Sequence, residues 1–169
     1  MARKVKCCIT GKWGTSDTFL KIDGKYYESQ EVYDWQQRMS NCWKLLIDKI
    51  TVDYLGYQKG EPYPTILNKR IKSLDFYDNE VIYRTILYCD DVISNAMRTK
   101  EFESTYMKIQ YILAILRNNI AKVWKIVREE RKTAKEQHKK LDDIVYVESL
   151  DTVDNPKQIN KDISKFVED

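Results

Sequence analysis

Candidates for catalytic chemistry are few in this chain of 169 residues. Its single histidine, His138, lies among lysine and glutamine residues that would neither bury nor orient it. A catalytic nucleophile needs an adjacent base and a third group that positions this base, and no such set can be assembled around His138. The sequence also contains no glycine-rich phosphate loop and no dinucleotide fingerprint. We therefore expect a protein that is not an enzyme and that uses no cofactor.

Two pairs of neighbouring acidic residues, Asp90-Asp91 and Asp142-Asp143, are the remaining candidates for a catalytic divalent metal. Adjacent carboxylates on a helix point to different faces, and they usually meet water. Solvated carboxylates are the simpler interpretation. A metal-dependent hydrolase or nuclease is accordingly the least favoured of three hypotheses.

The N-terminal cysteines have the setting of a metal site. Cys7 and Cys8 open a turn that continues through Thr10-Gly11, and a predicted hairpin and helix follow. This order of parts resembles the treble-clef zinc fingers, a resemblance that implies a zinc ion held by thiolate or imidazole ligands. Here Glu28 and Glu31 occupy the spacing of the second ligand pair, so the pattern is degenerate. We expect a hairpin without metal.

Cysteine usage and the absence of long apolar runs suggest a cytoplasmic protein. The four cysteines sit at spacings that suggest no disulfide framework, and Cys42 and Cys89 fall on apolar helix stripes where a thiol packs as a small hydrophobe. No apolar run approaches the roughly 20 residues of a membrane span. The basic start of the chain lacks the apolar stretch of a secretory signal. We therefore expect the thiols to be free and the protein to have no membrane partner. The expected location is the cytoplasm, which is the host cytoplasm if the chain is encoded by a phage.

Helical periodicity dominates the sequence, and glycine and proline are scarce. Apolar spacing predicts a first helix from Ser29 to Gly56, a short second one over 66–74, a third from Asp78 to about Lys100, and a fourth whose apolar face runs from Ile109 to Val127. Charged residues extend the fourth helix to Lys140, so that it projects beyond the core. The fold class is therefore mainly α, a bundle of about four helices.

Smaller elements are predicted at the two ends. Residues 18–22 and 25–27 form a short β-hairpin around the turn Asp23-Gly24. In the C-terminal appendage, residues 144–147 could form a short strand, and Asn155-Pro156 would begin a last small helix. The predicted organisation is a β-hairpin over 1–28, the bundle with its projecting helix over 29–140, and an acidic tail over 141–169.

Charge is unevenly distributed behind a net charge of only +3. Residues 117–140 carry a net +6, whereas residues 141–169 carry −5. A basic helix can follow a phosphate backbone, although a solvated helix face explains the same charges equally well. Folding of the acidic tail onto this helix is the simplest expectation. Two alternatives stay open: a tail that leaves the helix free, and a tail whose carboxylates act as a decoy for a nucleic-acid-binding site. The candidate binding residues are Arg117, Lys122, Lys125, Arg128, Arg131, Lys132, Lys135, Lys139 and Lys140.

A second basic group surrounds aromatic residues of the predicted hairpin. Bases can stack on such aromatics. Aromatic residues of a hairpin more often cover a core, and we expect packing here. Trp13 and Lys25 nevertheless count among the candidate binding residues. The group consists of Arg3, Lys4, Lys6, Lys12, Lys21 and Lys25 around Trp13, Tyr26 and Tyr27.

Two segments resemble a known family. Asn79-Glu80-Val81-Ile82 and the later segment 109–119, with its sequence IQYILAILRNN, are similar to the DnaD-type helical modules of Gram-positive bacterial and phage replication proteins. Those modules carry a tryptophan just after the asparagine, whereas Trp124 lies further on. The lysine-, isoleucine- and asparagine-rich composition is typical of AT-rich genomes. The chain thus resembles small accessory proteins of phages and mobile elements, a group that includes replication accessories and anti-CRISPR inhibitors.

These observations lead to two binding hypotheses. The first is a non-catalytic protein that acts on a nucleoprotein complex, for example an inhibitor of a host defence nuclease. The second is a nucleic-acid-binding replication or regulatory accessory. The expected partners are a host protein or nucleoprotein complex, or DNA or RNA directly. Trp35, Trp43 and Trp124 lie on helical stripes that would also permit a homodimer.

Overall fold

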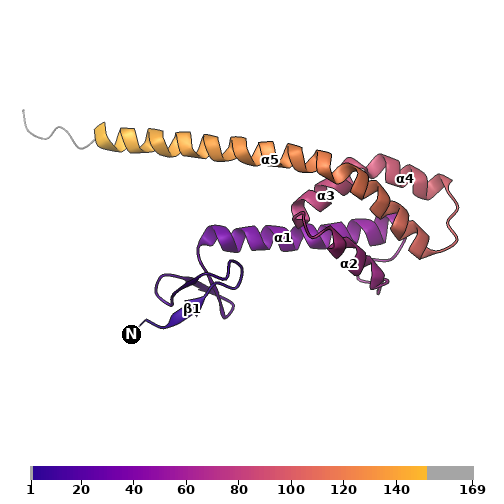
Figure 1. The fold of residues 1–169 in the computed structure, drawn as a ribbon, viewed down its shortest axis with the longest axis horizontal. Coiled ribbons are helices and arrows are strands. Elements are labelled where there is room, and N and C mark those ends of the chain that lie inside the picture. Colours follow the sequence, from indigo (N-terminus) through magenta and orange to yellow (C-terminus); the bar gives the residue numbers. More distant parts are fainter. Residues whose placement is uncertain (1, 152–169) are drawn as a thin grey trace, which may run out of the picture. The chain divides into compact units, whose positions relative to one another are not determined.

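A computed structural model describes the backbone of residues 2–151 and the side chains of residues 2–137. Figure 1 shows a mainly α-helical chain, which confirms the predicted fold class. Two small antiparallel strand pairs form its N-terminal region. The chain forms two compact units, Met1–Lys125 and Ile126–Asp169. Within the described residues, no helix combines the length and the apolar character that a membrane crossing requires.

The N-terminal region contains two strand pairs rather than one. The predicted hairpin is confirmed: β3 (Leu20–Ile22) pairs with β4 (Lys25–Tyr27), and Asp23 and Gly24 adopt the positive φ angles, 50° and 76°, of a tight turn. Before it, β1 (Lys4–Lys6) pairs with β2 (Trp13–Thr15). We did not predict this first pair, because strands of three residues are too short to show an alternating pattern and, unlike β3 and β4, these two are not joined by a two-residue Asp-Gly turn.

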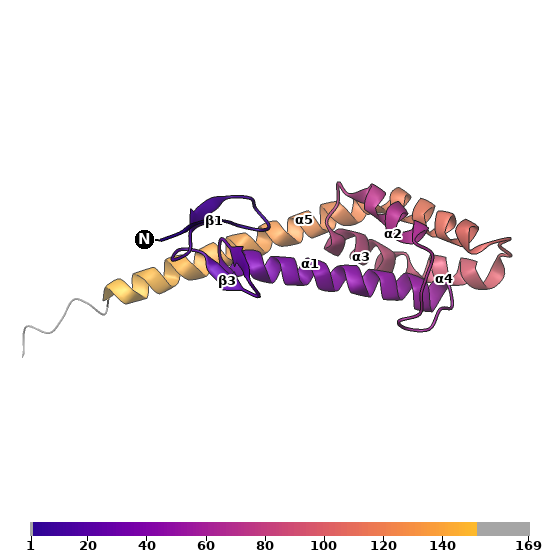
Figure 2. The same ribbon diagram turned by 90° about the horizontal axis from the view of Figure 1, so that it is seen from below.

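Helix α1 (Gln30–Asp48) begins where predicted. The Ser29 hydroxyl caps it by accepting a hydrogen bond from the Val32 amide at 3.4 Å. Tyr27, at the end of β4, packs edge-on against Tyr33 of α1 with 5.1 Å between ring centroids. The predicted helix continues towards Gly56, but its last part is the π-helix η1 (Lys49–Tyr54). Figures 1 and 2 show α1 alongside α3 (Asn79–Tyr88), and these two helices are in extensive contact.

The predicted third helix is wrong as a single element. The short segment before it is as predicted, with α2 (Ile66–Ile71) followed by the 3-10 turn η2 (Lys72–Leu74). The helix that starts after Asp78 breaks at Cys89, which separates α3 from α4 (Asp90–Thr99). Residues 82, 86, 89 and 93 keep helical spacing across the break, so the apolar pattern could not reveal it.

Helix α5 (Thr105–Asp151) confirms the predicted fourth helix and its extension. The predicted strand over 144–147 is wrong, since these residues belong to α5. No glycine or proline lies between Arg128 and Asp151 to end the helix, and most residues there favour helix. The helix predicted from Asn155, the rest of the acidic tail and the proposed contact of that tail with the basic helix lie outside the described residues.

The core of the first unit lies between its helices. Its fully buried side chains come from every helix of that unit, at positions that the apolar spacing indicated. Their burial stabilises the fold by roughly 25 cal/mol per Å² of apolar area. They include Leu46, Ile50, Leu67, Ile71, Ile86, Ile93, Ile109, Ile112, Leu113 and Leu116.

Candidate nucleic-acid interface

Trp13 lies on the outer face of the first strand pair, with 63% of its surface exposed. The register places Lys6 directly opposite Trp13, and Lys4 lies two residues along on the same face. The ammonium groups of Lys4 and Lys6 lie 5.1 and 5.8 Å from the centroid of the Trp13 ring, within cation–π range. The expectation that Trp13 packs into a core is therefore wrong.

Trp13 is exposed because other side chains fill the opposite face of the same strands. Gly14 leaves room for the ring of Phe19, which lies so close that even a single added methyl group would overlap it. Val5, opposite Gly14, is buried on this inner side. Because Phe19 and Val5 occupy the inner face, the neighbouring Trp13 projects to the outside. For Tyr27, which is 3% exposed, the expectation of packing is confirmed.

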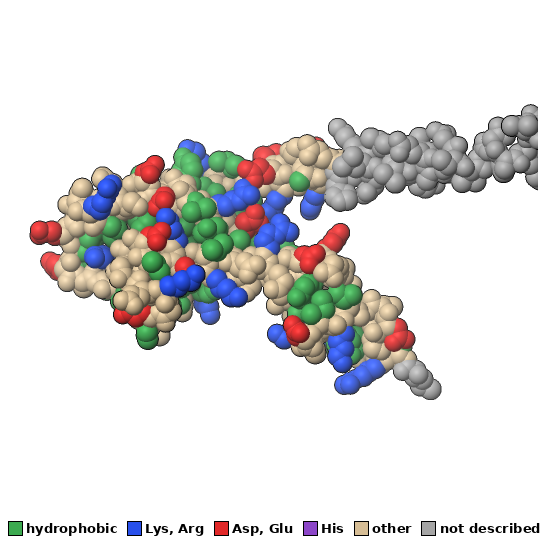
Figure 3. All heavy atoms as spheres, turned by 180° about the vertical axis from the view of Figure 1, so that it is seen from behind, with side chains coloured by type: hydrophobic (Ala, Val, Ile, Leu, Met, Phe, Trp, Pro, Cys, Tyr) green, Lys and Arg blue, Asp and Glu red, His purple; other side chains and the backbone are tan. Residues whose placement is uncertain are grey.

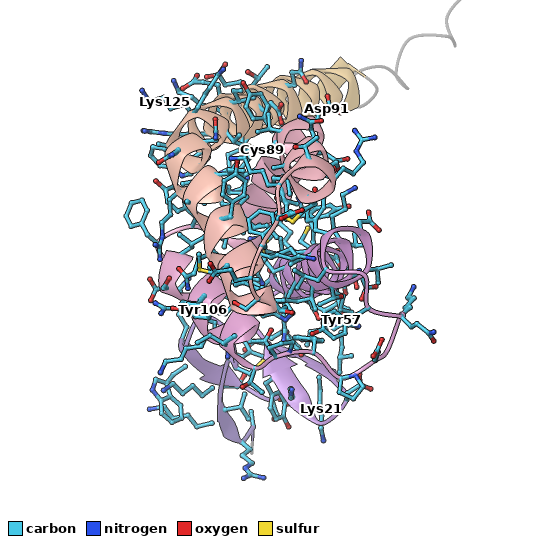
Figure 4. The ribbon with its side chains drawn as sticks, turned by 90° about the vertical axis from the view of Figure 1, so that its right-hand side faces the viewer. Lys21, Tyr57, Cys89, Asp91, Tyr106 and Lys125 are labelled. Carbon is cyan, nitrogen blue, oxygen red and sulfur yellow. The ribbon has the colours of Figure 1, made fainter. Side chains whose placement is uncertain are left out.

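The second strand pair adds cations and an aromatic ring to this surface. Lys21 lies opposite Tyr26, with its ammonium 5.7 Å from the ring centroid. A shallow hollow of about 420 Å³ opens between the two pairs, and none of its lining residues is acidic. Figure 3 shows several Lys and Arg side chains near the N-terminal end of the chain, and Figure 4 shows Lys21 at the outer edge. We call Arg3, Lys4, Lys6, Trp13, Lys21 and Tyr26 the hairpin surface. Lys25, an exposed residue of β4, is not part of this lining.

The basic residues of α5 divide between the two units. Within the first, the Arg117 guanidinium donates to the Ser73 hydroxyl at 3.3 Å. The Lys122 ammonium donates to the Tyr88 hydroxyl at 2.5 Å and lies 5.0 Å from that ring, and this hydrogen bond raises the pKa of Lys122. Lys125 is exposed on the outside of α5 (Figure 4). Arg117 and Lys122 thus tie α5 to neighbouring helices.

In the second unit, Arg128, Arg131, Lys132 and Lys135 share one side of α5. A helix turns by about 100° per residue, so these four positions fall within an arc of roughly 100°. We call them the α5 stripe. The Lys132 ammonium lies 3.8 Å from the Glu129 carboxylate, but both side chains are about two-thirds exposed, and such an ion pair contributes little. The side chains of His138, Lys139 and Lys140 lie outside the described residues.

Hydrogen bonds join the residues that resemble zinc ligands. The Thr10 hydroxyl donates to the Glu28 carboxylate at 2.9 Å, and Lys12 forms an ion pair with the other oxygen of Glu28 at 2.5 Å. Cys7, 2% exposed, accepts a hydrogen bond from the Thr10 amide. Burial raises the pKa of this thiol, but hydrogen bonds from Thr10 and nearby amides outweigh it and lower the pKa from 9.0 to about 7. Among the described residues, no three His, Cys, Asp or Glu side chains gather as a metal site.

The acidic and cysteine residues considered as candidates in the sequence have structural roles or are packed in the fold. Asp90 accepts hydrogen bonds from Tyr54 at 2.7 Å, Lys49 at 3.0 Å and Ser94 at 3.1 Å, so its carboxylate holds α4 against η1. Cys89 is buried, as predicted, and burial raises the pKa of its thiol. Cys42 is only partly buried. All four cysteines are unpaired.

One surface was not predicted from the sequence. Phe76, next to η2, is 79% exposed, and its ring lies 5.0 Å from the Tyr77 ring and 6.4 Å from the Trp124 ring. A hollow of about 360 Å³ is lined by residues that include Tyr77 and Trp43. A single exposed phenylalanine in a turn carries no periodic signal, so the sequence could not single it out.

These features describe a small helical protein with a basic, aromatic surface at its N-terminal strands. A family model described as SPbeta prophage protein YorH matches residues 16–165, and the chain belongs to this family. It is thus a phage-type protein, and the resemblance to phage proteins is confirmed at this level. The first strand pair, with Trp13, precedes the matched range. No curated protein and no solved structure gives a significant match.

Proposed function

We propose that the protein is a non-catalytic accessory protein of a phage that binds nucleic acid, and that the hairpin surface makes the contact. One observation supports this proposal above the others. Trp13 stands exposed beneath two lysines, in a hollow whose charged lining residues are all cations. Exposing this much aromatic surface costs free energy without a partner, and the surrounding charge suits a polyanion.

The electrostatics favour phosphate over an acidic protein as the partner. Arg3, Lys4, Lys6 and Lys21 approach the hollow from both strand pairs, so they can neutralise several phosphates of one strand. Each phosphate contact releases condensed counterions, and this gain falls as the salt concentration rises. The α5 stripe offers a second group of four cations, so the two groups must be separated by experiment.

The test is a salt series with labelled single- and double-stranded DNA and RNA. Two matched variants each remove four cations: Arg3/Lys4/Lys6/Lys21→Ala on the hairpin surface and Arg128/Arg131/Lys132/Lys135→Ala on the α5 stripe. We expect the intact protein to bind with micromolar or tighter affinity (~10⁻⁶ M) that weakens steeply with salt. The hairpin variant should lose this binding, with the salt slope reduced by about one per lost phosphate contact. The α5 variant should retain it.

Two results would contradict the proposal. Loss of binding in the α5 variant alone would transfer the contact to the α5 stripe. Absence of binding by the intact protein, at low salt and with every nucleic acid, would refute nucleic-acid binding altogether.

A second candidate function is inhibition of a host nucleoprotein complex through a protein contact, as in anti-CRISPR proteins. The observation that favours it is Phe76, whose exposed ring joins Tyr77 and Trp124 in an aromatic cluster. Aromatic anchors of this kind dominate the binding energy of protein interfaces. Inhibition of a host defence nuclease by the intact protein, and its loss on Phe76→Ala, would support this function. Light scattering of the same variant tests whether the cluster instead joins two copies.

A further inference from the structure

We infer that the hairpin surface takes an unpaired nucleotide, with the base stacked on Trp13 and the neighbouring phosphates on the surrounding cations. This inference rests on the proposed function and names its ligand class, single-stranded DNA or RNA. The hairpin surface contains a π-face and a set of cations in one hollow, and a stretch of single strand presents the complementary groups.

The position of Trp13 makes its ring available to a base. The Trp13 side chain is 63% exposed, and the ammonium groups over its ring belong to the flexible side chains of Lys4 and Lys6. When a base slides onto the ring, the lysine ammonium groups can move from the ring to the phosphates on either side of that base. Cation–π contact in the free protein is thereby exchanged for stacking and ion pairing.

The second strand pair supplies the other side of the hollow. The Lys21 ammonium lies over the ring of Tyr26, and both residues line the hollow together with Trp13 and Arg3. A volume of about 420 Å³ falls in the range of about 300–1,000 Å³ that is typical of small-ligand sites. The hollow is therefore large enough for a nucleotide.

The expected preference between single strands and a duplex depends on which groups of the nucleic acid are exposed. In a duplex the base faces are stacked on one another, so a duplex would offer this surface only its phosphates. An unpaired nucleotide offers its phosphates and also a free base face. Stacking on an aromatic side chain contributes about 1–3 kcal/mol per base and depends little on base identity. We therefore expect a preference for single strands with little sequence preference.

The experiment measures anisotropy of labelled oligothymidylate, oligouridylate and a duplex at one salt concentration. Trp13→Ala should weaken binding of single strands by about 5- to 150-fold, which is the loss of one stacking contact, and leave duplex binding unchanged. Trp13→Phe should retain part of the affinity. Trp35→Ala is the matched control, since Trp35 is also exposed, at 42%, but lies on α1 outside the hollow. The salt slope should stay the same in Trp13→Ala, because no charge is removed. Thermal unfolding of each variant serves as the check that it is folded.

The outcomes separate this inference from the proposed function. Equal affinity for single strands and duplex, together with intact-like binding by Trp13→Ala, would overturn base stacking while nucleic-acid binding stands. Equal losses of single-strand and duplex binding in Trp13→Ala would also overturn it. A protein that binds none of the three ligands would refute both. Comparison of oligothymidylate with oligouridylate then assigns the strand as DNA or RNA.

Discussion

At the scale of single residues, hydrogen-bond partners decide what a side chain does. Glu28 sits at a position that would hold a zinc ligand in a treble-clef finger, yet it accepts hydrogen bonds from Lys12 and Thr10. These bonds join the turn after β1 to the end of β4. Each oxygen of the Glu28 carboxylate thus accepts a hydrogen bond from the turn, and these two bonds tie the turn to the strand.

The hydrogen bond from Lys12, with a further one from Thr10, lowers the pKa of Glu28 below its ordinary value of 4.5. A lowered pKa in the folded state means that ionised Glu28 stabilises the fold above pH 4.5. This contribution disappears as the pH falls through the lowered pKa. We expect Glu28→Gln to be less stable than the intact protein at neutral pH, with a difference that shrinks in acid.

Urea unfolding across this pH range measures the effect. Glu31→Gln is the control, because Glu31 is an exposed glutamate three residues further along the chain. A difference between Glu28→Gln and the intact protein that stays constant with pH would contradict the assigned role of the carboxylate.

At the scale of elements, one carboxylate lies where two irregularities of the helices meet. Asp90 begins α4 immediately after the break at Cys89, and it binds Tyr54 and Lys49 of the π-helix η1. The wide π-helical turn brings these two donors, five residues apart, to the same carboxylate. The break in one helix and the π-helical end of another thus meet at a single group.

We predict that Asp90→Ala destabilises the fold by roughly 1–3 kcal/mol, since it leaves the buried Tyr54 hydroxyl without its acceptor. Asp91→Ala is the matched control. Both residues lie in the first turn of α4 and interact alike with the helix dipole, but Asp91 is exposed. The free energy of unfolding from urea titrations should separate the two variants. Equal losses would show that the dipole, and not the contact with η1, is responsible.

At the scale of the whole molecule, the first unit derives its stability from apolar faces of several helices. Ile86 of α3 is completely buried, while Val92 of α4 is 59% exposed. Comparing the effects of alanine substitution at these two β-branched residues therefore tests how much burial in the core stabilises the fold. Removal of buried methyl groups leaves a cavity that the surrounding helices fill only in part.

Ile86→Ala should therefore cost about 2–5 kcal/mol of unfolding free energy. Val92→Ala should change it by no more than about 0.5 kcal/mol. Denaturant titrations followed by circular dichroism provide both values. A small effect at Ile86 would mean that α3 does not form part of the core as described.

Local sequence carries enough information for much of the secondary structure. The apolar spacing from Ile109 to Val127 indicates a helix because side chains three and four residues apart lie on one face. Ser29 and Asp23-Gly24 indicate a helix start and a hairpin turn because their chemistry satisfies the backbone there. These signals depend on neighbours in the chain, so the sequence by itself determined the mainly helical class and most helix positions.

Only the tertiary structure decided the features that depend on distant residues. The break at Cys89 lies beside contacts between Asp90 and η1, which belongs to a much earlier part of the chain. Trp13 is exposed because Phe19 takes the inner face at Gly14, and Lys21 joins it only when two strand pairs come together. Periodicity records which face of an element is apolar but not which distant element covers it. The hairpin surface therefore could be recognised only once the chain was folded.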